Sequence, residues 1–345
     1  MITKEMSNRI KSIGFLMTCI IAFYHCNYSG EAVSPFDRRA NSLIDSTAET
    51  VAFAAMCWFF SISGFLLFRN LTFKNYAEKL KKRTFSLLLP YFIWQIASFA
   101  LIIISALIRH AHTAPKELIR GFIDGVFLMK SWPPNGALWY LYALFLLTAL
   151  SPILLLLFKN KRVGWIVATA LTILIYRLNY TDNLINQYVF FYGYVKLIIT
   201  YFPSFILGAF MGLFSENSDG TDKIKYILFL LSVSIVFESA YPGMVKDCLV
   251  RVLPILLLYF MPTVSALDDR KIYRLSFLIY AIHQPLLEIR RLLLPIVSRL
   301  PYAFCANLAL RILFVITVIA AAALIRFVLG KLAPKLLKAV TGGRS

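Results

Sequence analysis

Apolar runs of about 20 residues recur along the whole chain, and each is long enough to cross a hydrocarbon core of about 30 Å as a helix. They predict a single all-α, polytopic membrane domain over residues 1–345, without a separate soluble module. We expect about ten spans, at 11–27, 51–69, 84–108, 138–158, 163–177, 189–213, 225–241, 247–265, 273–289 and 303–329.

The composition agrees with a membrane protein. Only 15% of the residues are charged and 59% are hydrophobic, whereas a soluble domain carries about 25% charged residues. The net charge of +19 is explained by Lys and Arg in cytoplasmic loops that face anionic lipid, so no nucleic-acid partner is predicted. The five cysteines are scattered and predict neither a disulfide framework nor a metal site.

Basic residues gather in alternate loops, which predicts that both termini lie in the cytoplasm and that the first span ends at the outer face. The segment 27–50 is then an outer polar loop, and we expect its acids to be solvated. Residues 115–130 predict an amphipathic helix on the outer leaflet, which either covers a site or is an idle surface helix.

His25 is the strongest candidate for chemistry, because it stands at the end of the first predicted span. Ionisable groups at membrane depth are costly and therefore suggest function. An imidazole with a pKa of about 6.5 can take the proton of an attacking hydroxyl. His283 lies in the outer half of the ninth predicted span, and helical spacing places Tyr280 and Gln284 on its side of that helix.

Three other candidates have two interpretations each. Arg83 begins the third predicted span, where it either sets topology or holds a phosphate through its guanidinium. Ser63 belongs to a small face of the second span, which favours close helix packing but also suits the wall of a substrate channel. Trp139 is typical of an aromatic belt, and we also count it among the candidate substrate-binding residues.

Five segments taken together resemble the acyltransferase 3 family of integral membrane acyltransferases, in the branch of surface-glycan and exopolysaccharide O-acyltransferases. They are FYH ending at His25, FFSISGFLLF at 59–68, KKRTFSLLLPYFIW at 81–94, PPNGALWYLYALFLLTALSPI at 133–153 and SFLIYAIHQPLL at 276–287. The resemblance makes His25 the essential first-span histidine, Arg83 the basic residue that opens the third span, and His283 the histidine of the penultimate span.

The resemblance implies transfer of an acyl group, usually acetyl, from cytoplasmic acyl-CoA to a hydroxyl of a surface glycan or lipid-linked saccharide. The enzyme would work in the inner, cytoplasmic membrane. Arg83, Lys82 and Lys11 would bind the nucleotide end of CoA, and its pantetheine arm would reach His25 between the helices. His25 would act as a general base or form an acyl-imidazole. Candidate donors to the developing oxyanion are Tyr24, Tyr280 and a protonated His283.

The sequence departs from the family at two places. Gly14 stands eleven residues before His25, where relatives carry Arg or Lys, and Lys11 lies one turn earlier as a substitute. Tyr142 and Ala143 replace an Arg-Asp pair. These departures leave two alternatives to an enzyme: a transporter or flippase for an envelope glycan intermediate, or a non-catalytic, divergent partner of a glycan-synthesis complex. The sequence leaves the oligomeric state open.

Overall fold

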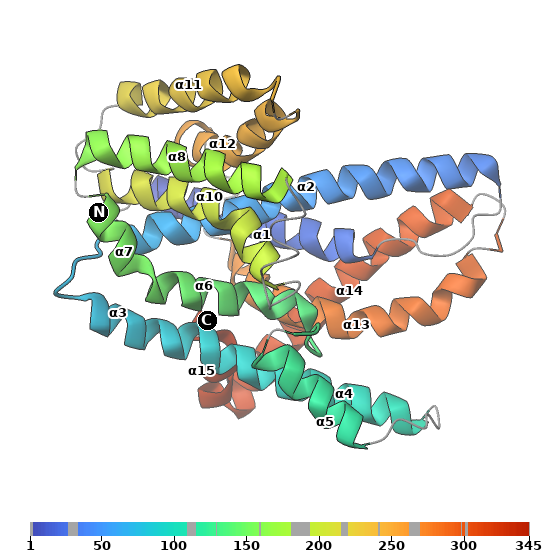
Figure 1. The fold of residues 1–345 in the computed structure, drawn as a ribbon. Helices are drawn as coiled ribbons and strands as arrows, with labels where there is room; N and C mark the ends of the chain where they lie inside the picture. Colours follow the sequence, from blue (N-terminus) through green and yellow to red (C-terminus); the bar gives the residue numbers. More distant parts are fainter. Residues whose placement is uncertain are drawn as a thin grey trace.

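The computed structural model describes residues 3–26, 34–108, 115–128, 130–158, 160–180, 194–214, 220–240, 242–261, 270–297, 299–300 and 303–344. Within these ranges every regular element is a helix, as predicted (Figure 1). The helices are α1 (Lys4–His25), α2 (Pro35–Phe68), α3 (Tyr76–Arg83), η1 (Thr84–Leu88), α4 (Leu89–Ile108), α5 (Pro115–Val126), η2 (Gly136–Leu138), α6 (Trp139–Ala149), α7 (Ser151–Leu157), α8 (Lys161–Tyr180), α10 (Tyr194–Phe214), α11 (Gly220–Phe237), α12 (Met244–Phe260), η4 (Lys271–Leu275), α13 (Ser276–Val297), α14 (Ala303–Leu332) and α15 (Pro334–Thr341).

Long apolar helices make this a membrane protein. Among the described residues, four helices are long and apolar enough to cross a bilayer, and the bent segment of η2, α6 and α7 raises the number to five. Each of the ten predicted ranges overlaps a helix or a run of consecutive helices, but the count of ten spans stays a prediction. So does the cytoplasmic placement of both termini.

Helix α2 corrects the prediction of an outer loop through residue 50, because it begins at Pro35 and runs for 34 residues. The hydroxyl of Ser34 caps it by accepting a hydrogen bond from the Asp37 amide at 3.1 Å. In Figure 1 its first half extends at the right of the view beyond the ends of α8 and α10, as do parts of α13 and α14.

Polar side chains on this first half of α2 bind α14. The Phe304 amide donates to Asp37 at 3.0 Å, and the Asn307 side chain donates to Asn41 at 3.0 Å. The Arg311 guanidinium, fully buried, pairs with Asp45 at 2.5 Å. Spacings of four residues on α2, and of three and four on α14, put each helix's contributors on one face. We call these six residues the polar ladder; it shows that Asp37 and Asp45 are structural rather than solvated. Glu31, which the prediction also covered, lies outside the described residues.

The small face of α2 packs against α10 with backbone in contact with backbone. A Cβ atom added at Gly208 would lie 1.9 Å from the Ser61 carbonyl oxygen, and one at Gly64 would lie 2.3 Å from the Phe205 carbonyl oxygen. The Ser61 hydroxyl donates to the Ser204 carbonyl at 3.0 Å. Close helix packing is therefore confirmed for Ser61 and Gly64, as small residues allow in membrane helices.

Helix α5 confirms the predicted amphipathic segment and docks on α4. The Phe122 ring lies 4.7 Å from the Phe99 ring, and the Tyr91 hydroxyl donates to the Val126 carbonyl at 3.0 Å. Ile119 on the same helix stays 55% exposed, which suits a helix in contact with lipid. Its position on the outer leaflet stays a prediction.

Candidate active site

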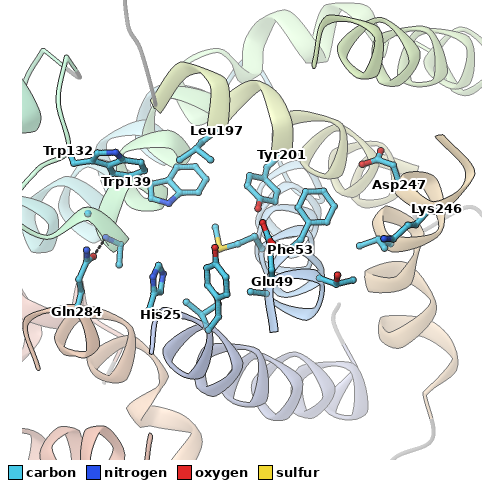
Figure 2. A pocket seen from close by; sticks show the side chains of 18 of the residues that line it. His25, Glu49, Phe53, Trp132, Trp139, Leu197, Tyr201, Lys246, Asp247 and Gln284 are labelled. Atoms are coloured by element: carbon cyan, nitrogen blue, oxygen red, sulfur yellow. Dashed lines mark hydrogen bonds between the residues drawn. The ribbon is translucent and has the colours of Figure 1, made fainter. Parts of the chain in front are cut away.

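Two cavities lie between α1, α2, α6 and α13. The larger, about 800 Å³, is lined by His25 and is called here the histidine cavity (Figure 2). The smaller, about 330 Å³, is lined by Arg83 and other cations and is called the basic cavity. On each of these four helices, the residues toward one end line one cavity and the residues toward the other end line the second cavity. Met56 lines both, so the cavities lie end to end with this side chain at their junction.

His25 ends α1 and is stacked against His283 of α13, with ring centres 5.1 Å apart and an interplanar angle of 30°. The two imidazoles therefore meet, as their predicted membrane depths implied. His283 is fully buried, and its Nδ1–H donates to the Ile279 carbonyl at 3.3 Å. In the neutral ring Nε2 is then an acceptor, and it has no hydrogen-bond partner among the described residues. This geometry favours His283 as a support for His25 over its predicted role as an oxyanion donor.

The start of η2 is held beside the histidines by α13. The Tyr280 hydroxyl donates to the Ala137 carbonyl. The Ala137 amide donates to the side chain of Gln284, which Figure 2 shows near His25. The sequence-based prediction that Tyr280, His283 and Gln284 share one side of their helix is confirmed. Because the Tyr280 hydroxyl is engaged with a carbonyl, Tyr24, whose ring centre lies 5.2 Å from that of His25, is the better placed of the two predicted oxyanion donors.

Two buried amide side chains, which sequence reasoning missed, fix the segment before η2. Gln95 exchanges two hydrogen bonds with the backbone of Asn135, at 3.0 and 2.9 Å. The Asn135 side chain donates to the Ala281 carbonyl at 2.8 Å. Both amides are fully buried, and their cost is offset by these bonds. The signal available in the sequence was Gln95, an amide inside the predicted span 84–108, whereas Asn135 lies in the polar segment before the next span.

The wall of the histidine cavity is polar and aromatic. Glu49, Lys246 and Asp247 line it together with the rings of Trp139 and Tyr201, and Figure 2 shows Lys246 and Asp247 across the cavity from His25. None of the three charged residues was predicted as a site residue. Carboxylates and aromatic rings in one concave wall are typical of sites for polar small molecules.

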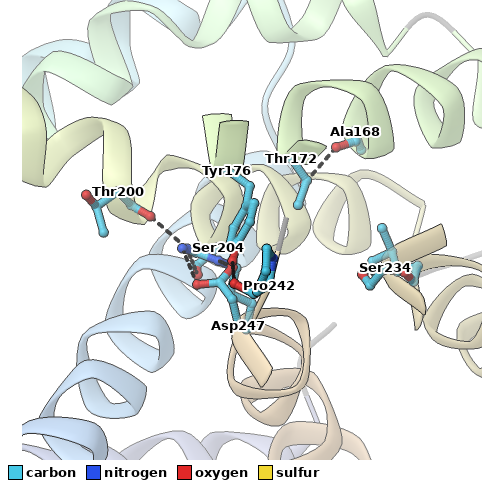
Figure 3. A network of polar contacts seen from close by, with 10 residues as sticks. Ala168, Thr172, Tyr176, Thr200, Ser204, Ser234, Pro242 and Asp247 are labelled. Carbon is cyan, nitrogen blue, oxygen red and sulfur yellow. Dashed lines mark hydrogen bonds and ion pairs between the residues drawn. The ribbon is translucent and has the colours of Figure 1, made fainter. Parts of the chain in front are cut away.

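Asp247 is held in that wall by Arg251. The guanidinium binds both carboxylate oxygens of Asp247, at 2.5 and 2.9 Å, and donates to the Thr200 carbonyl at 2.7 Å (Figure 3). Arg251 is 4% exposed. Such a bidentate pair fixes the orientation of the carboxylate, so Asp247 presents a defined edge to the cavity.

The basic cavity is lined by several positively charged side chains. Lys11, Arg83, Arg274 and Arg344 line it, and among the described residues its lining contains no Asp or Glu. The Ser63 hydroxyl lies 2.8 Å from the hydroxyl of Tyr140, which also lines the cavity. Ser63 thus serves the channel wall rather than the contact with α10. An excess of positive charge in a partly enclosed space attracts an anion.

Most of the predicted site residues fall in one cavity or the other. His25, Tyr24 and Trp139 line the histidine cavity; Lys11, Arg83, Ser63 and Tyr280 line the basic cavity. Lys82 lines neither, since its exposed ammonium pairs with Glu78 at 2.5 Å. The ring of Trp139 faces the histidine cavity, which fits its interpretation as a substrate-binding residue; its place in an aromatic belt stays a prediction.

The two departures from the family pattern differ in importance. Gly14 lines the basic cavity next to Lys11, which confirms that Lys11 can reach this space. Tyr142 lies against Tyr91, with ring centres 5.5 Å apart, and Ala143 is buried. Neither Tyr142 nor Ala143 lines a cavity, so the positions of the Arg-Asp pair lie outside both cavity walls in this chain.

A comparison with known protein families identifies the family of this chain. The acyltransferase 3 family model, described as an acyltransferase domain, matches residues 14–327. The chain therefore belongs to the acyltransferase 3 family and is a membrane acyltransferase. No curated protein and no solved structure matches it significantly.

Proposed function

We propose that the chain is an O-acyltransferase of the cytoplasmic membrane. It moves an acetyl or similarly short acyl group from cytoplasmic acyl-CoA to a hydroxyl of a surface glycan or lipid-linked saccharide. The observation that carries this proposal is the end-to-end arrangement of a cavity lined by cations and a cavity lined by His25. A donor with an anionic end and an uncharged thioester end suits that arrangement.

The donor binds with its phosphates in the basic cavity, where Lys11 and Arg83 attract them. Its arm then follows α1 and passes Met56. From Lys11 to His25 the helix rises about 21 Å at 1.5 Å per residue. The thioester thus arrives beside the imidazole from the opposite end of the helix.

The acceptor binds in the histidine cavity. Glu49 and Asp247 accept hydrogen bonds from hydroxyl groups, while Trp139 and Tyr201 offer flat apolar faces to a sugar ring. A volume of about 800 Å³ is within the usual range of ligand pockets, about 300–1,000 Å³.

His25 acts as the general base. It takes the proton of the acceptor hydroxyl while the oxygen attacks the thioester carbonyl and the oxyanion forms. As the carbon–sulfur bond breaks, the imidazolium returns the proton to the leaving thiolate, so that an ester and free CoA result. Such proton transfer contributes about 10²–10⁴-fold to the rate. His283 supports the ring through the stacking contact at 5.1 Å.

The test compares envelope glycans from cells with the chain, without it and with His25→Ala, by mass spectrometry. We expect an added acyl group only with the unchanged chain, and a loss of about 10²–10⁴-fold in transfer by purified His25→Ala. Binding of CoA to the variant serves as the control for folding. Acylation that survives His25→Ala would refute the assignment of the base, and glycans that never gain an acyl group would refute the proposed reaction.

A further inference from the structure

Arg344 enters the basic cavity from a part of the chain far from the motifs that define the rest of the site. Helix α15 ends at Thr341, and the next two residues, Gly342 and Gly343, have φ values of +61° and +75°. Glycine takes this left-handed conformation without strain. The double turn reverses the chain, and the Arg344 side chain then lines the cavity that also contains Arg83.

The turn is anchored on η1, the π-helical segment that directly follows Arg83. A Cβ atom added at Gly342 would lie 2.3 Å from the Ser86 carbonyl oxygen, so the two backbones are in direct contact. The Trp94 indole donates to the Val340 carbonyl at 3.0 Å. The position of Arg344 relative to Arg83 is therefore set by packing between α15 and the η1–α4 segment.

The charges around Arg344 are not balanced inside the cavity. Its guanidinium carbon lies 4.8 Å from the centre of the Phe277 ring, a cation–π contact that orients the group. Arg83 and Tyr140 line the same cavity, so two guanidinium groups of like charge share one partly enclosed space. Because no carboxylate among the described residues lines this cavity, an anion that binds between the two arginines would relieve their repulsion.

We propose that Arg344 and Arg83 together bind a diphosphate group in the basic cavity. A planar guanidinium matches phosphate oxygens with two parallel N–H donors, and two arginines from different elements can hold neighbouring phosphates. The inference deepens the proposed function and rests on it in one respect, namely that the diphosphate is that of CoA. Arg344 is then a donor-binding residue that no motif of the sequence contains.

The experiment measures binding to the full-length protein in lipid nanodiscs with three probes: CoA, pantetheine and inorganic diphosphate. Arg344→Ala is expected to lower the affinity for CoA and for diphosphate by about tenfold or more, since a hydrogen bond to a charged group is worth about 1.5–3 kcal/mol. Pantetheine, which has no phosphate, is expected to bind unchanged. Arg344→Lys keeps the positive charge but lacks the two parallel N–H donors of a guanidinium, so it should recover part of the lost affinity.

The matched control is Lys335→Ala, which removes an exposed positive charge from α15 outside both cavities; it should leave all three affinities unchanged. Unchanged affinity of Arg344→Ala for CoA and diphosphate would overturn the proposal. An equal loss for pantetheine would do so too, because it would indicate a structural effect. If diphosphate binding depends on Arg344 while CoA does not bind, the anion site stands and the acyl-CoA reaction fails.

Discussion

The histidine cavity and the basic cavity share walls from α1, α2, α6 and α13 and yet differ in charge. Glu49, Asp247 and Lys246 give the first a mixed wall, whereas the charged residues that line the second are all cations. Most of the charges that distinguish them come from elements outside the shared helices: Lys246 and Asp247 lie on α12, whereas Arg83 ends α3 and Arg344 follows α15. The difference teaches that charge can separate the two proposed substrates, because the carboxylates of the histidine cavity would repel the anionic part of the proposed donor.

Helix α1 shows how one helix serves both environments. Gly14 and Thr18 line the basic cavity, and Ile21 and His25 line the histidine cavity. Their spacing of four, three and four residues keeps them on one face. The change from small residues to an imidazole along that face is what separates the two cavities.

The most severe test of the comparison is Met56→Trp, at the junction. An indole there should block the arm of the donor, and misplacing a reacting group by about 1 Å already costs about 10²-fold. We therefore expect transfer from acetyl-CoA to fall by about 100-fold or more, while CoA still binds. Rates of acetyl transfer measure the effect. Met56→Ala is the control, because the smaller side chain leaves the junction open. Full activity of Met56→Trp would show that the donor does not pass between the cavities at this point.

Arg83→Ala should affect the basic cavity alone. Loss of a charged phosphate contact is expected to raise the KM for acetyl-CoA by about 10–100-fold and to leave the KM for the acceptor unchanged. The matched control is Lys82→Ala, because Lys82 is adjacent in sequence but pairs with Glu78 on the exposed face; surface pairs of this kind contribute little. If Arg83→Ala and Lys82→Ala raised the KM for acetyl-CoA equally, Arg83 would contribute only its positive charge and not a specific phosphate contact.

Glu49→Gln is the converse change in the histidine cavity and should have the smallest effect of the three. It keeps the shape of the side chain but replaces a charged acceptor by a neutral one, a loss of about 1 kcal/mol per hydrogen bond. The KM for the saccharide should rise about fivefold, and the KM for acetyl-CoA should not change. Steady-state kinetics with each substrate varied in turn distinguish these results. A change in the donor KM alone would contradict the division between the cavities.

The sequence predicted the helical class and the central pair of the site because both depend on local patterns. Apolar runs identify helices wherever they occur, and an imidazole inside such a run stands out by itself, as His25 and His283 do. Arg83 was found in the same way, from its place at the head of an apolar run.

Long-range packing explains what the sequence did not predict. The first half of α2 looked like a loop because Asp37, Asn41 and Asp45 are polar, and their partners on α14 are 266 or 267 residues further along the chain. Arg344 could not be assigned to the site because its position depends on the contact between Gly342 and Ser86. The periodicity of polar residues in a sequence indicates which face of a helix is polar, but it does not indicate which other helix packs against that face.

The backbone contact between α2 and α10 limits which parts of the enzyme can move. At Gly208 and Gly64 the two helices touch without any side chain between them, so sliding one past the other would bring carbonyl oxygens into collision. Helices α2 and α10 therefore behave as one rigid wall. Any widening of the cavities must then come from the other elements that line them, such as α1, α6, α12 or α13.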